Sequence, residues 1–424
     1  MKVLIRKIIK EVQLAFLLGF LFVFAMFQGG FVSWFLFYSM LPILLYMMTI
    51  PFFPLHNWKV ERRLSDRYLQ ASSKIEIHIS IKRKIPFPLF FLVVEEMLPE
   101  TLQYQDIGKK KYQYLADQNG FIRKRQWKKV VYPGFRRHFS ISYSLEHLPR
   151  GGKHQLSQVR LQIGDPFGFV ETDHSFDLTK EFFVYPAIQD IKWKYVSQSL
   201  EEGANPSYMH DEKLTNVVSS VREYIPGDRF SWIDWKTTAR KNTVMTKEFE
   251  QEKDSNLSLI LDVDGLQQGK FLVFEAAVEW TASLLQTLRK KDQHVSFSAL
   301  GTYNKHFSAQ QVQFQFPTVQ NYLATINQES ASPLSQRMFL PLPELMKGSI
   351  VLFVITQLDG TLVDRLVSWK NQDYLVMVCY IISEKDHQTL QTQLIKSLRL
   401  KNIYVQVISE QRLISEHWEV NPSR

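Results

Sequence analysis

The first 58 residues contain two long apolar stretches, at 12–28 and 31–53, and neither includes a charged residue. Gly29 and Gly30 separate them and allow a tight turn. About 20 apolar residues cross a bilayer core as a helix, so this pattern predicts a transmembrane hairpin. No small-x-small cleavage site follows the first stretch, which favours an anchor over a cleaved signal peptide.

Residues 59–186 follow the period of a β-strand. Apolar and polar side chains alternate from Lys74 to Ile81, as in a half-buried strand. Further strands are expected at 88–95, 121–131, 135–145, 156–163 and 182–186. Turn residues separate these stretches and no helical pattern intervenes, so we predict a β-sandwich-like domain.

From residue 257 to 424 strand-length apolar stretches alternate with amphipathic ones. Strands are expected at 257–262, 294–300, 349–355, 374–381 and 403–408, and helices at 271–291, 319–328, 361–370 and 385–398. This alternation predicts an α/β doubly wound sheet, in which ligands bind at the carboxyl ends of the strands. Residues 187–256 are then a linker and a motif segment.

Charge is distributed unevenly within the net +9. Residues 59–160 carry 21 Lys/Arg against nine Asp/Glu, a net +12, whereas 161–424 carry 26 against 32, a net −6. Lys and Arg flank the hairpin on both sides and are missing from its loop, which predicts that both ends are cytoplasmic. A basic region beside the spans suits an anionic lipid surface. No nucleic-acid-binding motif accompanies the charge, so nucleic acid is not an expected partner.

The stretch from Val221 to Arg240 is rich in Arg, Asp and Trp. We expect Asp228 to cap a short helix on which Trp232, Trp235 and Ala239 share one face. One interpretation is structural, with buried tryptophans and Arg–Asp pairs. The other is a partner-docking surface, because Trp and Arg are typical interface anchors. Both involve the same candidate residues: Arg222, Tyr224, Gly227, Asp228, Trp235, Ala239 and Arg240.

Carboxylates follow two strands of the expected doubly wound sheet. Asp262 and Asp264 end the first strand, and Asp359 follows a later one. Such oxygens bind hard cations, but ordinary strand-end residues look the same. The single Cys379 excludes a disulfide framework and a zinc cluster built on cysteines.

Several segments, taken in order, resemble the bacterial membrane family known as "domain of unknown function 58". The matching residues are Arg150-Gly151, the turn Gly164-Asp-Pro-Phe-Gly168, Val184-Tyr-Pro186, Arg222-x-Tyr224-x-x-Gly227-Asp228 and Ile233-Asp-Trp235-Lys-x-x-Ala239-Arg240. The resemblance implies two N-terminal spans, a β-domain and a von Willebrand factor A-like domain at 257–424. It also implies a MoxR-type AAA+ ATPase as partner, often with a transglutaminase-like membrane protein.

The same resemblance bears on metal binding. A-like domains commonly bind a divalent metal such as Mg²⁺ through Asp-x-Ser-x-Ser after the first strand. Here the motif is Asp262-Val263-Asp264-Gly265-Leu266, which keeps the first Asp and lacks both serines. We therefore expect no cofactor. Asp262, Asp264 and Asp359 are the residues that would hold a metal if this degenerate site binds one.

Together these observations predict a non-enzymatic adaptor or scaffold in the cell membrane. Its multi-pass anchor would hold cytoplasmic domains, and its A-like domain would work with a MoxR-type ATPase in cell-envelope assembly or stress maintenance. Two alternatives stay open: a metal-dependent hydrolytic enzyme, and an extracytoplasmic adhesion receptor. No Ser/His/Asp or His-metal spacing supports the first alternative, and the Lys/Arg bias opposes the second.

Overall fold

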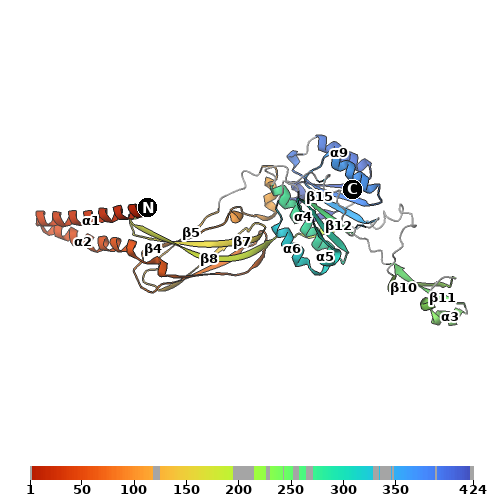
Figure 1. Cartoon of the computed structure of the whole chain (residues 1–424), viewed down its shortest axis with the longest axis horizontal. Coiled ribbons are helices and arrows are strands. Elements are labelled where there is room, and N and C mark those ends of the chain that lie inside the picture. The colour runs from red at the N-terminus through yellow and green to blue at the C-terminus, as the bar shows by residue number, and fades with distance from the viewer. Residues whose placement is uncertain are drawn as a thin grey trace. The chain divides into compact units, whose positions relative to one another are not determined.

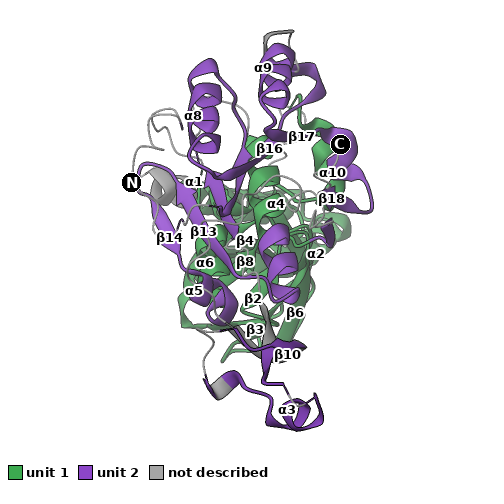
Figure 2. Cartoon of the chain, turned by 90° about the vertical axis from the view of Figure 1, so that its right-hand side faces the viewer, with its two compact units in different colours: residues 1–188, 267–282, 317–328 green, residues 189–266, 283–316, 329–424 purple. Residues whose placement is uncertain are grey.

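The computed structural model describes residues 2–117, 125–193, 214–225, 230–241, 243–251, 257–263, 271–327, 334, 345, 348–386 and 389–420. Contacts divide the chain into two compact units (Figure 2). Unit 1 contains residues 1–188, 267–282 and 317–328, and unit 2 contains the remainder. The domain limits expected from the sequence stay a prediction, and each unit is described below by itself.

Unit 1 begins with the two expected apolar helices, α1 (Lys2–Gln28) and α2 (Phe31–Thr49) (Figure 1). Gly29 between them has a φ of +57°, which is easily reached only without a side chain. The stretches Ile9–Gln28 and Phe31–Phe52 are long and apolar enough to cross a membrane. Pro42 lies inside α2, and a short 3₁₀-helix, η1 (Ile50–Phe52), follows it.

Two β-sheets follow in unit 1. An antiparallel three-stranded sheet has the order β1-β3-β6 and a five-stranded sheet has the order β2-β8-β7-β4-β5. Their strands are β1 (Lys59–Leu64), β2 (Tyr68–Gln70), β3 (Ile75–Lys82), β4 (Phe91–Glu96), β5 (Trp127–Val131), β6 (His138–Leu145), β7 (Gly151–Gly164) and β8 (Glu171–Tyr185). Every second residue of β3 is buried, which confirms the alternation expected there.

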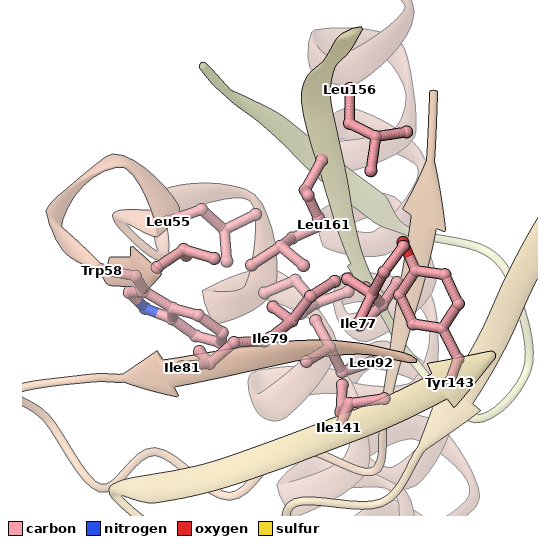
Figure 3. Packing of buried hydrophobic residues seen from close by; sticks show 14 of the residues in the cluster. Leu55, Trp58, Ile77, Ile79, Ile81, Leu92, Ile141, Tyr143, Leu156 and Leu161 are labelled. Atoms are coloured by element: carbon pink, nitrogen blue, oxygen red, sulfur yellow. The ribbon is translucent and has the colours of Figure 1, made fainter. Parts of the chain in front are cut away.

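One hydrophobic core contains buried residues of both sheets. Ile77, Ile79 and Ile141 come from the three-stranded sheet and meet Leu92 and Leu161 of the five-stranded sheet (Figure 3). Leu55 and Trp58, from the connection between α2 and β1, belong to the same core. The end of the helical hairpin and both sheets therefore pack as one body.

Parts of two later helices complete unit 1: residues 271–282 of α4 (Phe271–Lys290) and 317–325 of α6 (Phe316–Thr325). The start of β7 approaches α6 closely. A Cβ atom on Gly152 would lie 2.0 Å from Cγ2 of Thr325, so only glycine permits this approach.

Unit 2 contains a six-stranded sheet in the order β14-β13-β12-β15-β16-β17. Its strands are β12 (Leu257–Asp262), β13 (Val295–Leu300), β14 (Lys305–Phe307), β15 (Ile350–Ile355), β16 (Leu375–Ile381) and β17 (Tyr404–Ile408). All neighbours pair in parallel except the edge strand β14. β12, β13 and β15 are buried along their whole length, as expected for a covered parallel sheet.

The helices of unit 2 include α5 (Ala309–Phe314), α8 (Gly360–Lys370), α9 (Thr389–Leu400) and α10 (Glu410–Ile414). A separate two-stranded pair joins β9 (Ile191–Trp193) to β18 (Trp418–Val420). The strands and long helices expected at 257–408 are confirmed with small shifts at their ends. Four short elements, β14, α5, α10 and β18, were not expected because each is only three to six residues long.

The motif segment forms a separate small element, called the arm below. It consists of the antiparallel strands β10 (Leu214–Glu223) and β11 (Met245–Gln251) with η6 (Phe230–Trp232) and α3 (Trp235–Lys241) between them. The arm is thus a two-stranded ribbon that carries one helical turn and one short helix.

Candidate functional site

The helix of the arm begins later than the sequence suggested. α3 starts at Trp235, and the carboxylate of Asp234 accepts hydrogen bonds from the backbone N–H groups of Lys236 (3.1 Å) and Thr237 (3.2 Å). Asp234 is therefore the N-cap, since these are among the N–H groups that lack a partner in the helix. The expectation that Trp232 and Trp235 share one helix is wrong, because Trp232 ends the separate 3₁₀ turn. The predicted cap, Asp228, lies outside the described residues, as does Gly227.

The arm exposes large apolar side chains instead of burying them. Trp235 is 67% exposed and Phe230 is 76% exposed, and Ile225 and Val244 are also exposed. The small interior of the arm is made by other residues, namely Ile233, Met245 and Thr246. The structural interpretation with a buried tryptophan is therefore wrong for Trp235.

Two more candidate residues of the arm, Tyr224 and Arg222, make contacts within it. The N–H of Tyr224 donates to the carbonyl of Val244 (2.9 Å), and its ring lies 6.4 Å from that of Phe230. Arg222 is half-buried and donates through Nη1 to the carbonyl of Glu223 (3.0 Å).

Cations dominate the described helix of the arm. Lys236, Arg240 and Lys241 are exposed on α3, as is Ala239. The hydrogen bond that the Asp234 carboxyl accepts from the backbone N–H of Thr237 lowers its pKa, and the bond from the Thr237 hydroxyl lowers it further. It therefore stays ionised at neutral pH beside these cations.

The structure describes two of the three carboxylates considered for a metal, Asp262 and Asp359. Asp262 is buried at the end of β12. Asp359 is the N-cap of α8, and its Oδ1 accepts from the N–H of Leu362 and the hydroxyl of Thr361, both at 2.7 Å. Asp264 lies outside the described residues. Within the described residues no group of three or more His, Cys, Asp or Glu side chains is placed to hold a metal ion.

A second concentration of polar chemistry lies inside unit 1. We call Asp106, Lys111, Arg150, Glu275 and Glu279 the ionic cluster; all five are buried. Arg150, just before β7, forms an ion pair with Glu275 of α4 through both Nε and Nη2. Its Nη1 also donates to the carbonyls of Leu323 (2.9 Å), Ala324 (3.0 Å) and Ile326 (2.7 Å). Arg150 thereby caps the carboxyl end of α6, where carbonyls lack helical partners.

The other half of the ionic cluster is centred on Lys111, in the 3₁₀-helix η4 (Gly108–Tyr114). Its ammonium group donates to Asp106 (2.6 Å) and to Glu279, and the hydroxyl of Tyr112 donates to the other oxygen of Glu279. The cluster holds three carboxylates against two cations. Burial raises the pKa of Glu279 to about 7. The charge of Lys111 opposes this rise, and the charge of Asp106 adds to it.

Sequence reasoning missed the ionic cluster, although Arg150 was part of the family resemblance. A local signal was present: Glu275 and Glu279 are four residues apart in an otherwise apolar helix segment, so they project from one face. A pair of carboxylates on a face that must be buried requires buried cations. The sequence did not indicate which cations these are.

Comparison with known proteins identifies the family of the chain. The family described as "Protein of unknown function DUF58" matches residues 220–341, which include the described helix of the arm. The "Uncharacterized protein YeaD" of Bacillus subtilis (strain 168) is 34% identical over 327 residues, or 77% of each chain. Among solved structures, Cwp6 from Clostridium difficile aligns over 86% of this chain and 53% of its own, at 8% identity and a TM-score of 0.15, too low to support any structural argument. On the strength of the family match and the YeaD relative, the chain belongs to the DUF58 family.

Proposed function

We propose that this protein is a non-enzymatic, membrane-anchored adaptor whose arm docks onto a cytosolic MoxR-type AAA+ ATPase. The observation that carries the proposal is the exposure of Trp235 and Phe230 beside the cations of α3. Large aromatic side chains next to Arg are the usual anchors of a protein interface. Exposed cations favour an acidic surface on the partner.

Two further features support docking by the arm. The exposed aromatic residues contribute little to its interior, which Ile233 and Met245 fill. The capped start of α3 and the pairing of β10 with β11 hold the backbone in place, so less ordering is needed on binding.

The proposal includes an A-like domain at 257–424. The order of the six-stranded sheet supports it, because the first strand, β12, is central and only an edge strand is antiparallel. Metal binding is not required for the adaptor role, since the arm makes the contact. In this proposal the Lys/Arg bias places the soluble part in the cytoplasm, and a transglutaminase-like membrane protein is a second partner.

Binding of a MoxR-type ATPase to the full-length protein in nanodiscs tests the proposal. We expect ATP-dependent association, and a Trp235→Ala change that weakens it about tenfold or more, the effect of an interface anchor worth over 1.4 kcal/mol. Tyr303→Ala is the matched control, because Tyr303 is an exposed aromatic residue of unit 2 outside the arm. The melting temperature should stay the same for both variants.

Two results would refute the proposal. One is the lack of any nucleotide-dependent association with a MoxR-type ATPase from the same cell. The other is equal weakening by Trp235→Ala and Tyr303→Ala, which would place the contact elsewhere. The side of the membrane on which the soluble part lies is tested separately. A reporter that is active only in the cytoplasm should be active when it is fused to the C-terminus.

A further inference from the structure

Three loops of unit 1 lie at the same end of its sheets. They are 83–90 between β3 and β4, 132–137 between β5 and β6, and 165–170 between β7 and β8, and we call them the proximal loops. The registers place them together, because Lys82 pairs with both Lys59 and His138, while Phe91 pairs with Gly164. Lys59 is the first residue of β1, so this is also the end at which the chain arrives from α2.

The proximal loops expose aromatic and apolar side chains with cations beside them. More than half of the surface is exposed for Ile85, Phe90, Tyr132, Phe135, Phe167 and Phe169. Exposed cations accompany them, namely Lys82, Lys84, Arg136 and Arg137. The carboxylate within these loops, Asp165, is buried and accepts the N–H groups of Phe167 (2.7 Å) and Val170. The exposed charge of the loops is therefore positive.

Contacts with α2 fix the depth of these loops. The hydroxyl of Tyr46 donates to the carbonyl of Pro88 (2.9 Å), and its ring stacks on that of Phe87 at 5.5 Å. Tyr46 lies within the stretch Phe31–Phe52 that can cross a membrane. It is six residues before Phe52, the end of that stretch, or about 9 Å along a helix. If α2 crosses a bilayer, loop 83–90 therefore lies at the boundary between headgroups and acyl chains.

A buried arginine holds two of the loops in this position. Arg83 donates to the carbonyls of Arg136 (2.7 Å), Phe87 (2.7 Å) and Gly134 (2.6 Å). Leu89 and Gly134 also exchange two backbone hydrogen bonds of 3.1 Å. The third loop is fixed by Asp165. The exposed aromatic side chains thus stand on an ordered support, which lowers the ordering cost of inserting them.

We propose that the proximal loops are a membrane-interface site, which inserts its aromatic side chains among anionic lipids around the hairpin. Aromatic residues favour the headgroup level, and each nearby Lys or Arg is attracted to an anionic surface. The bilayer is the occupant because loop 83–90 contacts Tyr46 of α2, and α2 belongs to a stretch that is long and apolar enough to cross a membrane. The site does not depend on the arm or on any ATPase.

Depth-dependent quenching tests this site in the full chain. A Phe169→Cys variant in a Cys379→Ala background carries an environment-sensitive fluorophore, in nanodiscs of equal parts phosphatidylcholine and phosphatidylglycerol. Lipids with a nitroxide near the headgroup should quench it about twofold or more, as expected for a group within 5–10 Å of the boundary. Lys153→Cys is the matched control: Lys153 is exposed at the opposite end of β7 and should not be quenched.

The lipid class is tested in the same system. The double change Arg136→Glu and Arg137→Glu should reduce quenching at position 169 in the mixed nanodiscs, and should have little effect in phosphatidylcholine alone. Equal fluorescence at position 169 with and without nitroxide lipid would overturn the proposal, and would leave a second protein as the occupant. Quenching that stays the same after the charge change and without phosphatidylglycerol would overturn the role of anionic lipid.

Discussion

The arm and the ionic cluster use charged residues in opposite ways. In the arm the cations of α3 are exposed, and the carboxylate of the N-cap Asp234 accepts hydrogen bonds from Lys236 and Thr237 of its own turn. In the ionic cluster every charged group is buried, and both cations pair with a carboxylate from a distant part of the chain: Arg150 and Glu275 are 125 residues apart, and Lys111 and Glu279 are 168 apart.

This difference implies that the ionic cluster determines the stability of unit 1 and that the arm is available for binding. A buried ion pair contributes little over an apolar pair, yet loss of one partner leaves an uncompensated buried charge. An exposed side chain can be removed with almost no effect on stability. Removal of a cation from the ionic cluster should therefore destabilise unit 1, whereas removal of an exposed side chain from the arm should alter binding alone.

The largest effect is expected from Arg150→Ala. The change removes the cation that pairs with Glu275 and the donor to three carbonyls at the carboxyl end of α6, so unit 1 should lose about 3–5 kcal/mol of stability. Urea unfolding of the full chain in detergent measures it. Arg160→Ala is the control, because Arg160, on β7, pairs with Asp173 and Glu95 at partly exposed positions and should contribute less than about 1 kcal/mol. Similar losses for the two variants would contradict the contrast.

An intermediate effect concerns the pH dependence of the ionic cluster. The pKa of Glu279 rises from 4.5 to about 7 in the folded protein, so its contribution to stability is complete below pH 4.5 and is lost as pH rises toward 7. Glu279→Gln mimics the protonated side chain and cannot lose a proton. The stability of this variant relative to wild type should therefore increase with pH, by at most about 1.4 kcal/mol per pH unit for one proton.

Thermal or urea unfolding of both proteins at pH 5, 6 and 7 gives this difference directly. Subtracting the two curves removes the titration of all other groups that both proteins share. Lys111, Tyr112 and Asp106 act on Glu279 in the cluster and remain in the variant. A difference that stays constant over this pH range would show that Glu279 is already ionised in the folded protein at pH 5.

The sequence predicted local elements well because their signals are local. The alternation in β3 and the continuous apolar stretch of β12 gave strands within one residue of their observed bounds. The pairing of Arg150 with Glu275 has no local signal, and Asp228 and Asp234 satisfy the same capping rule, so the sequence could not choose between them.

Charge counting along the chain also has a physical limit. The basic excess of residues 59–160 was assigned to a surface facing lipid. Among the described residues of this segment, four cations are buried and held by carboxylates or carbonyls: Arg62, Arg83, Lys111 and Arg150. Arg62, for example, is paired with Glu96 inside the β-domain. The net charge of a segment therefore overstates the charge that it presents to lipid.

The smallest effect is expected from Asp234→Ala on the arm. Loss of the cap removes the acceptor for two N–H groups of α3, so the amide hydrogens of Lys236 and Thr237 should exchange roughly fivefold faster. The overall melting temperature should not change, because the turn is local. Asp234→Asn separates the effect of the cap from that of the charge, since Asn caps a helix nearly as well.

The lowered pKa of Asp234 means that its contribution to stability is present above its unfolded pKa and is lost only as pH falls through the folded pKa. Exchange in the wild type should therefore be protected equally at pH 5 and pH 8 after correction for the intrinsic rate. A lower melting temperature for Asp234→Ala would instead join the arm to the stability of the larger body, and the contrast with the ionic cluster would fail.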